Sequence, residues 1–193
     1  MATLFVDKLD PQSGTALEIG TSGDTVTVPS GATFNVAGTL QSGGAAVSNT
    51  PAFSVILSAS ITSGISDNTW FKIPFDSEEF DTDGCFDPTT NYRFTPDVAG
   101  KYFFSAQWGN GDGGPRAEWI SIYKNGSEAF TNYFYAQDTS TIDDFTPIVT
   151  GLIDMNGSSD YVEFYMKQLS GGGPKIISGD KTTWAYGYRL IGA

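Results

Sequence analysis

The sequence has no histidine, and this absence excludes much of the usual catalytic chemistry. Ser-His-Asp and Cys-His activation of a nucleophile, zinc sites that contain histidine, and the commonest general base near neutral pH all need that residue. Asp and Glu are plentiful, but no spacing singles out the pair of carboxylates that glycoside hydrolysis uses. We therefore predict that the protein is not an enzyme.

Cysteine and long apolar runs are also scarce. Cys85 is the single cysteine, so no disulfide can form within the chain, and we expect a small buried hydrophobic residue there rather than a reactive thiol. No run approaches the roughly 18 apolar residues of a membrane span, and the first residues lack the charged and apolar regions of a secretory signal. We expect no membrane insertion and no export by that route.

Basic residues are few. The chain has 10 Lys and Arg against 22 Asp and Glu, which gives a net charge of −12. A charge of this sign repels the phosphates of nucleic acids and anionic lipid headgroups alike. We therefore expect neither nucleic acid nor a membrane surface as a partner.

What the sequence does contain is a repeated β pattern. Apolar and polar residues alternate in short runs bounded by Gly, Pro, Asn and Asp, whereas no sustained helical periodicity is present. Fourteen Phe, nine Tyr and four Trp supply side chains for a core. The expected strands are 52–59, 69–75, 91–96, 100–109, 118–126, 128–137, 145–155, 160–169 and 182–192. Their number and spacing predict an all-β fold, a two-sheet sandwich or jelly roll.

The alternation also predicts which side chains share a face. Val162, Phe164 and Met166 lie on one side of their run and should pack inward. Tyr186 and Tyr188 line one face of the last run. Aromatic faces of this kind are usually core or an interface between protomers.

From Pro51 to the end, the chain resembles the C1q-like globular head, a jelly roll shared in outline with tumour necrosis factors. The resemblance rests on ordered motifs, namely "PAFSV" (51–55), "CFDPTTNYRFTPDVAGKYFFSAQ" (85–107), "ISIYKNG" (120–126) and "TTWAYGYRLIG" (182–192). Asn91, where the family usually has Gly, and a Gly-rich insertion at 109–115 depart from the pattern. Ligand specificity is therefore not carried over from any family member.

The resemblance implies a homotrimer, because such heads pack three jelly rolls around an axis through aromatic faces. Its implied interface residues in this chain are Tyr102, Phe104, Tyr186 and Tyr188. The alternative, that these residues belong to the core of a single protomer, stays open at this point.

Residues 16–50 form a different segment, which we interpret as a shaft of short β-repeats with a linker. Apolar pairs recur in it at 17/19, 26/28 and 34/36. One chain of such rungs buries little, whereas three chains wound together could bury the apolar side of each rung. Residues 25–41 resemble the short β-repeats of bacteriophage fibre and virion proteins. The alternative is a disordered leader rich in Gly, Ser and Thr.

Residues 1–15 contain an apolar cluster that a shaft does not need. We interpret them as an attachment segment that docks on other virion proteins. The alternative is an ordinary first strand of the shaft.

An acidic loop at 75–87 is the strongest charge feature of the sequence. Clustered carboxylates suit Ca²⁺, which takes six to eight oxygen ligands. The candidate ligands are Asp76, Glu78, Glu79, Asp81 and Asp83. The loop lacks the full spacing of an EF-hand, and the alternative is a solvated loop without metal.

Together these features predict a trimeric fibre or spike on the surface of a bacteriophage virion, with residues 51–193 as a jelly-roll head that binds a host-surface glycan or protein. The head's exposed loops would carry the contact. The candidate contact residues are Trp108, Asn110, Asp112, Arg116, Gln137, Asp138 and Asp143. The main alternative is a capsid or tail decoration protein without a receptor; a glycan-cleaving enzyme and a secreted C1q-like protein fit less well.

Overall fold

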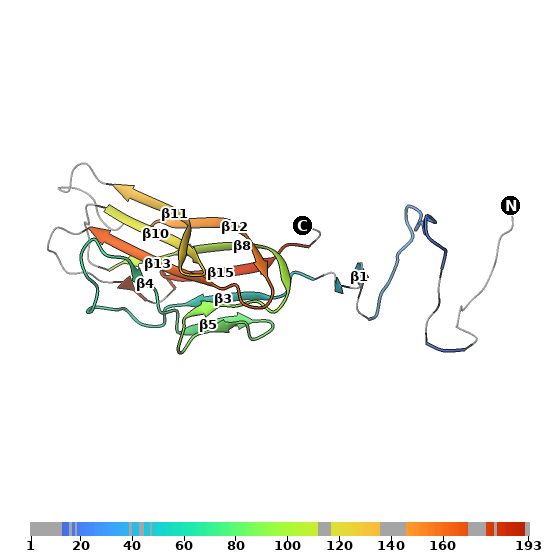
Figure 1. Cartoon of the computed structure of the whole chain (residues 1–193), viewed down its shortest axis with the longest axis horizontal. Coiled ribbons are helices and arrows are strands. Elements are labelled where there is room, and N and C mark those ends of the chain that lie inside the picture. The colour runs from blue at the N-terminus through green and yellow to red at the C-terminus, as the bar shows by residue number, and fades with distance from the viewer. Residues whose placement is uncertain are drawn as a thin grey trace. The chain divides into compact units, whose positions relative to one another are not determined.

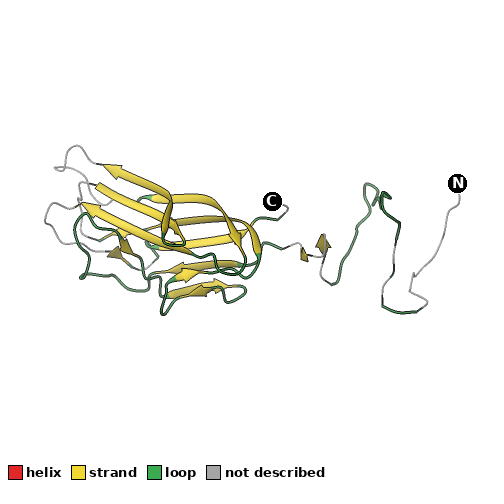
Figure 2. Cartoon of the chain, in the orientation of Figure 1, coloured by secondary structure: helices red, strands yellow, loops and turns green. Residues whose placement is uncertain are grey.

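The structure is a computed structural model, and it describes residues 13–15, 17, 19–38, 40–42, 45–46, 48–111, 117–135, 146–169, 177–179 and 181–191. The chain divides into two units, residues 1–46 and 47–193. Regular structure in the described ranges is β throughout (Figure 2). These ranges include no helix long and apolar enough to cross a membrane.

Two antiparallel sheets make up the second unit (Figure 1). One has the order β11-β10-β13-β7-β6, and β4 also pairs with β13. Its strands are β4 (Phe71–Lys72), β6 (Phe86–Asp87), β7 (Arg93–Phe94), β10 (Ala117–Lys124), β11 (Ser127–Tyr135) and β13 (Val162–Leu169). We call this the six-stranded sheet.

The other sheet has the order β12-β8-β15-β3-β5, and we call it the five-stranded sheet. Its strands are β3 (Ala52–Ile56), β5 (Ser77–Asp81), β8 (Ala99–Gln107), β12 (Ile148–Asn156) and β15 (Trp184–Arg189). A small pair, β9 (Gly109–Asn110) and β14 (Ile177–Ser178), completes the unit.

All nine predicted strands are present, which confirms the all-β jelly-roll sandwich. The structure adds β5, inside the segment predicted to be an acidic loop. Its sequence SEEFD shows no clean apolar alternation, and β5 lies at the edge of the five-stranded sheet. Charged side chains are common on edge strands because they discourage pairing with other chains. The loop prediction was therefore wrong for residues 77–81, and also for residues 86–87, which form β6.

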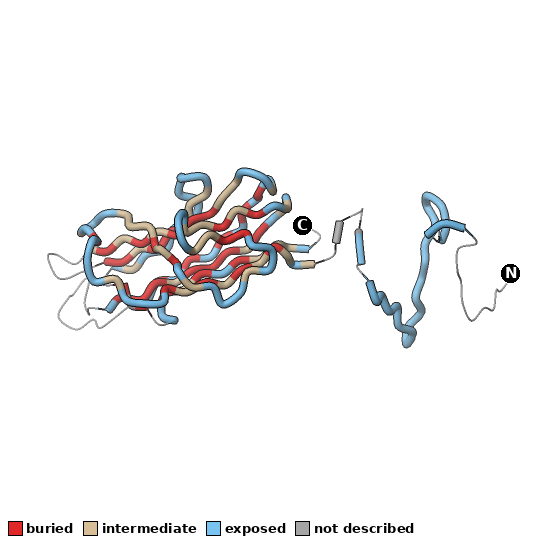
Figure 3. Tube along the Cα trace, turned by 90° about the horizontal axis from the view of Figure 1, so that it is seen from below, coloured by how far each residue is buried: buried red, intermediate tan, exposed pale blue. Residues whose placement is uncertain are grey.

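The core lies between the two sheets and combines aromatic with aliphatic side chains. The buried stretches of the strands are red in Figure 3. Phe53 of β3 is fully buried, and its ring stacks on Phe86 and Phe94 of the opposite sheet, with centroids 5.1 and 4.6 Å apart. Val162, Phe164 and Met166 are fully buried, as their alternation predicted. Burial of each large apolar side chain stabilises the fold by roughly 1.5–3 kcal/mol.

Gly187 of β15 makes room for aromatic rings from the two strands that flank it, β8 and β3. A Cβ atom there would lie 2.5 Å from the Phe104 ring and 2.9 Å from the Phe53 ring. Only a residue without a side chain leaves room for these two rings at this point of β15.

Cys85 is buried and unpaired, as predicted. Burial raises the pKa of its thiol to about 11, and the carboxylates of Asp97, Asp81 and Asp83 act in the same direction. The thiol is therefore protonated and a poor nucleophile at neutral pH.

The connection between β6 and β7 is organised by Asp87. Its carboxylate accepts hydrogen bonds from the backbone amides of Thr89, Thr90 and Asn91 at 2.9–3.0 Å. These bonds, led by the one from Thr90, hold the pKa of Asp87 well below its ordinary value. Asn91 also donates its side-chain amide to this carboxylate, so the departure from the family pattern has a local role.

The N-terminal unit buries little of its apolar surface. Its large apolar side chains that the structure describes are exposed in a single chain, from 37% for Val36 to 69% for Phe34. The predicted rungs at 17/19, 26/28 and 34/36 are not strands in the described residues, and the only pairing there joins β1 (Gln41–Ser42) to β2 (Ala45–Ala46). Most of the predicted attachment segment, residues 1–12, lies outside the described residues.

Replacing Phe53 tests the aromatic core. Because Phe53 is fully buried and stacked on two rings, we expect Phe53→Ala to lower the free energy of unfolding by about 3–5 kcal/mol in urea denaturation. Phe80→Ala is the matched control, since Phe80 is 50% exposed, and should cost less than about 1 kcal/mol. Equal losses for the two variants would contradict this core assignment.

Asp87 makes stability depend on pH. Folding lowers the pKa of Asp87 from its value of 3.8 in the unfolded chain. Its contribution to the free energy of unfolding is therefore complete above pH 3.8 and is lost as the pH falls towards the pKa of the folded state. We expect Asp87→Ala to destabilise the protein equally at about pH 7 and pH 5, and less at about pH 3. Urea midpoints of both proteins measure this, and a gap that does not change with pH would argue against the capping role.

Candidate functional site

The outer face of the five-stranded sheet carries a cluster of partly exposed aromatic side chains. Phe103 of β8 lies opposite Tyr188 of β15, with ring centroids 5.5 Å apart, and its ring centroid is 6.5 Å from that of Tyr186. Trp184 and Tyr186 stack within 14° of parallel at 5.2 Å. The alternation that points Ala185 and Gly187 into the core places these rings outside.

Strand β12 extends the same face with aliphatic side chains. Leu152 lies opposite Phe103, and Ile148 lies opposite Gln107. Leu152 is 55% exposed and Ile148 is 44% exposed. With Phe103, Trp184, Tyr186 and Tyr188 they form what we call the outer apolar face. Clusters of exposed apolar side chains often mark contact sites on protein surfaces.

A pocket of about 190 Å³ opens at one edge of the outer apolar face. It is lined by Ser54, Ile56, Glu79, Lys181, Trp184 and Tyr186. Lys181 and Glu79 approach each other at 3.4 Å, and Ser54 donates to Glu79 at the same distance. Aromatic walls with a few polar groups suit insertion of a side chain from a partner.

Two of the four predicted interface residues are wrong. Tyr102 and Phe104 are fully buried between the sheets, because they occupy the inward positions of β8. The Tyr102 hydroxyl donates to the Val98 carbonyl, and burial raises its pKa well above the ordinary value. Tyr186 and Tyr188 do lie on the outer apolar face. Phe103, Leu152 and Ile148 were missed, although their positions alternate with buried neighbours.

Two of the predicted receptor-contact residues are also wrong. Trp108 is fully buried, and its indole nitrogen donates to the Trp119 carbonyl of the opposite sheet at 3.0 Å. Asn110 is only 5% exposed and belongs to β9. The glycines around these residues are typical of a loop tip, but Gly109 and Asn110 form β9, which pairs with β14. Asp112, Arg116, Gln137, Asp138 and Asp143 lie outside the described residues.

The five candidate calcium ligands are engaged separately. Asp76 accepts from the Ser58 amide and hydroxyl at 2.7 Å, and Asp81 accepts from the Phe86 amide at 2.7 Å. Asp83 accepts from Thr82, Glu79 faces the pocket, and Glu78 lies exposed on β5. No group of three or more metal-ligating side chains is assembled among the residues that the structure describes. Calcium binding therefore stays a prediction, which would require these hydrogen bonds to be exchanged.

Comparison with known proteins places the fold. No protein-family model matches the chain, and no curated protein matches it. Among solved structures it is similar to Eiger TNF from S. frugiperda, with 8% identity over 74% of this chain and 93% of that chain and a TM-score of 0.53. It is also similar to murine APRIL at pH 8.0, with 9% identity over 72% of this chain and 98% of that chain and a TM-score of 0.54. The globular domain of zebrafish complement 1qA has 16% identity over 73% of this chain and 97% of that chain, with a TM-score of 0.49.

The unit formed by residues 47–193 thus has a jelly-roll fold of the tumour necrosis factor type. Identities near 10% show a shared fold and carry no residue roles with them. Any proposal for the function must therefore be argued from the surfaces of this chain, such as the outer apolar face.

Calcium gives a direct test of the acidic segment. A bound ion stabilises the folded state by mass action. If calcium binds this segment, the melting temperature should be higher in millimolar CaCl₂ than in EDTA, whereas a solvated loop without metal predicts the same value in both. A calcium-dependent rise that Asp81→Asn abolishes would restore the predicted site.

Proposed function

We propose that the chain is a homotrimeric virion protein of a bacteriophage, in which an N-terminal shaft presents jelly-roll heads that bind a host-surface or virion component. The outer apolar face carries this proposal. It exposes Leu152, Ile148 and a cluster of aromatic rings in a single chain, a surface that association with other copies would remove from water.

The N-terminal unit supports association independently of the head. Its exposed side chains are Leu17, Ile19, Val26, Val28, Phe34, Val36 and Leu40. Each would contribute roughly 1.5–3 kcal/mol if fully buried, against the entropy of ordering the chain. A single chain offers them no partner among its described residues, whereas winding with two further copies does.

The bacteriophage origin rests on the sequence, through the resemblance of residues 25–41 to fibre repeats. In this proposal the first residues attach the trimer to other virion proteins, and the heads face outward. Three heads on one shaft convert weak single contacts into avidity, because the second and third contacts form at high effective concentration.

The rival is a capsid or tail decoration protein without a receptor. The two functions share the trimer and differ in what the head binds. Binding of the purified trimer to intact host cells favours attachment, whereas binding to particles stripped of this protein and not to cells favours decoration.

Light-scattering mass of the full chain tests the trimer. We expect a mass of three chains for the wild type. On dilution, Leu152→Glu should dissociate at a higher concentration than the wild type, because the charge would be buried in an apolar interface while the N-terminal unit still associates. Tyr135→Glu is the matched control, since Tyr135 is 57% exposed and Leu152 55%, but Tyr135 lies on the six-stranded sheet. A monomeric wild type, or equal effects of both variants, would sink the proposed assembly.

A further inference from the structure

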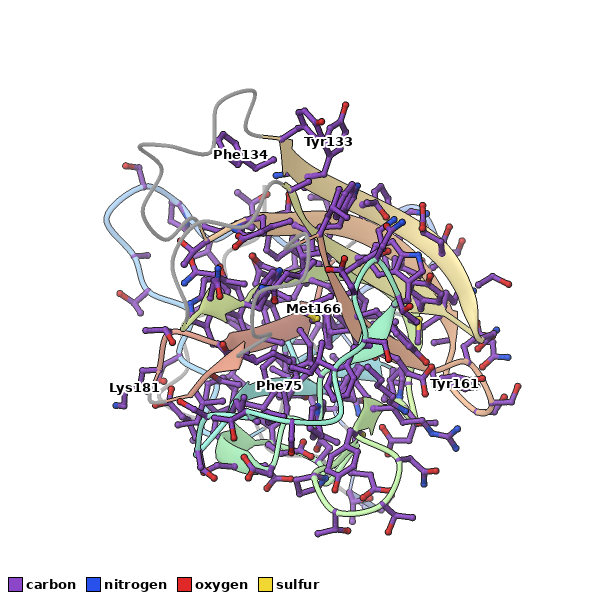
Figure 4. All side chains as sticks on the ribbon, turned by 90° about the vertical axis from the view of Figure 1, so that its left-hand side faces the viewer. Phe75, Tyr133, Phe134, Tyr161, Met166 and Lys181 are labelled. Atoms are coloured by element: carbon purple, nitrogen blue, oxygen red, sulfur yellow. The ribbon has the colours of Figure 1, made fainter. Side chains whose placement is uncertain are left out.

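The outer face of the six-stranded sheet carries a second aromatic surface, unlike the first. Trp119 of β10 lies directly opposite Tyr133 of β11, and their rings stack with centroids 6.3 Å apart and planes 23° apart. Tyr133 is 63% exposed. In Figure 4, Tyr133 projects at the outer edge of this sheet, whereas Met166 lies in the interior.

A lysine occupies the centre of this surface. Lys167 of β13 lies opposite Trp119, and its Nζ is 4.2 Å from the Trp119 ring centroid and 5.0 Å from that of Trp70. Attraction between an ammonium and the negative face of an indole fixes the cation between the two rings. We call Trp70, Trp119, Tyr133 and Lys167 the Trp-Lys platform.

Lys167 differs from the other lysines that the structure describes. Each of those has a carboxylate partner, in the pairs Lys72–Glu163, Lys101–Asp154, Lys124–Asp160 and Lys181–Glu79. Within the described residues Lys167 contacts two rings and no carboxylate. Its three N–H donors are therefore held in place by the rings, and no carboxylate among the residues that the structure describes accepts from them.

Neighbouring side chains hold the platform rigid. The Trp70 ring meets Tyr123 edge-on at 6.0 Å, and Tyr123 packs on Tyr165 at 4.3 Å. The Tyr165 hydroxyl donates to Glu163, which also accepts from Lys72. Side chains anchored on paired strands in this way lose little conformational freedom when a ligand binds.

The platform offers two kinds of contact at once. Flat indole and phenol rings present a negative π-face, which attracts the weakly positive C–H groups of a saturated ring. The ammonium beside them donates charge-assisted hydrogen bonds, which are strongest to a carboxylate. A sugar ring that carries a carboxylate supplies both complements within one residue.

We propose that the Trp-Lys platform binds an acidic glycan, which packs on the exposed Tyr133 ring and along the outer edge of Trp119, and whose carboxylate accepts hydrogen bonds from Lys167. The assignment rests on the proposed binding role of the head and names its ligand class, but it does not depend on the trimer. It also places the contact on strands rather than on the loops predicted from the sequence.

Other ligands that stack on aromatic rings fit less well. Single-stranded nucleic acid uses aromatic rings together with a positively charged groove, whereas this platform has one cation on a chain of net charge −12. A heavily sulfated glycan meets the same repulsion. A carboxylated sugar needs only the local contact, since fields from distant charges are screened beyond about 8 Å at physiological salt.

Calorimetric titration of the full chain tests the assignment. The acidic probes are oligogalacturonate and sialyllactose, the neutral probes are maltotriose and lactose, and a sulfated oligosaccharide and a short single-stranded DNA serve as polyanions. We expect binding of at least one acidic probe and at least tenfold weaker binding of its neutral counterpart, since one charge-assisted contact contributes about a factor of ten.

Four variants separate a ligand role from a structural one. Lys167→Gln should weaken binding of the acidic probe about tenfold, Lys167→Arg should preserve it, and exposed Tyr133→Ala should weaken it roughly threefold to tenfold. Lys101→Gln, on the other sheet, is the control and should bind as the wild type does. Unchanged melting temperatures show that each variant is folded.

The assignment is overturned if no acidic probe binds, if neutral probes or polyanions bind equally well, or if Lys167→Gln leaves affinity unchanged. Light-scattering mass of the same samples keeps the two proposals apart. A monomer that binds an acidic probe through Lys167 would contradict the proposed assembly and support the platform. A trimer that binds no probe would support the proposed assembly and contradict the platform.

Discussion

The two-residue period of the β-strand is the constraint on which this structure depends. Along β8, β12, β13 and β15, one set of side chains enters the space between the sheets and the next set leaves it. Phe53 and its aromatic neighbours fill that space, and Gly187 lets the rings meet at its centre. The outward positions of the strands also carry aromatic residues, so each sheet has an aromatic outer surface that does not contribute to the core.

Those two surfaces have different chemistry. The outer apolar face combines Leu152, Ile148 and aromatic rings with no fixed cation at its centre, so burial against another apolar surface suits it. The Trp-Lys platform holds Lys167 in place between rings, and burial of that cation against an apolar surface would be costly. The two proposals divide between these surfaces: in them the five-stranded sheet associates with copies of the chain, and the six-stranded sheet binds the ligand.

Much of this fold could be predicted from the sequence, because the alternation of apolar and polar residues along a strand shows which side chains are buried. Val162, Phe164 and Met166 were placed correctly, and so were all nine main strands.

The wrong predictions of site residues have physical causes. Tyr102 and Phe104 share a strand with Phe103 of the outer apolar face but point the other way, and the resemblance to trimeric heads did not distinguish the two faces. Trp108 sits beside glycines, yet its indole is used to join the sheets. Lys167 could not be singled out because its aromatic partners come from β10 and from Trp70, far away in sequence.

The central claim is that the outer apolar face is buried between copies of the chain. Hydroxyl-radical footprinting of the intact protein tests it most directly, because oxidation reports the exposure of individual side chains. The account predicts that Tyr186, Tyr188 and Leu152 are strongly protected relative to their exposure in one chain, while Tyr133 and Tyr135 of the six-stranded sheet oxidise freely. Oxidation of Tyr186 and Leu152 at the rate expected for a single chain would contradict it.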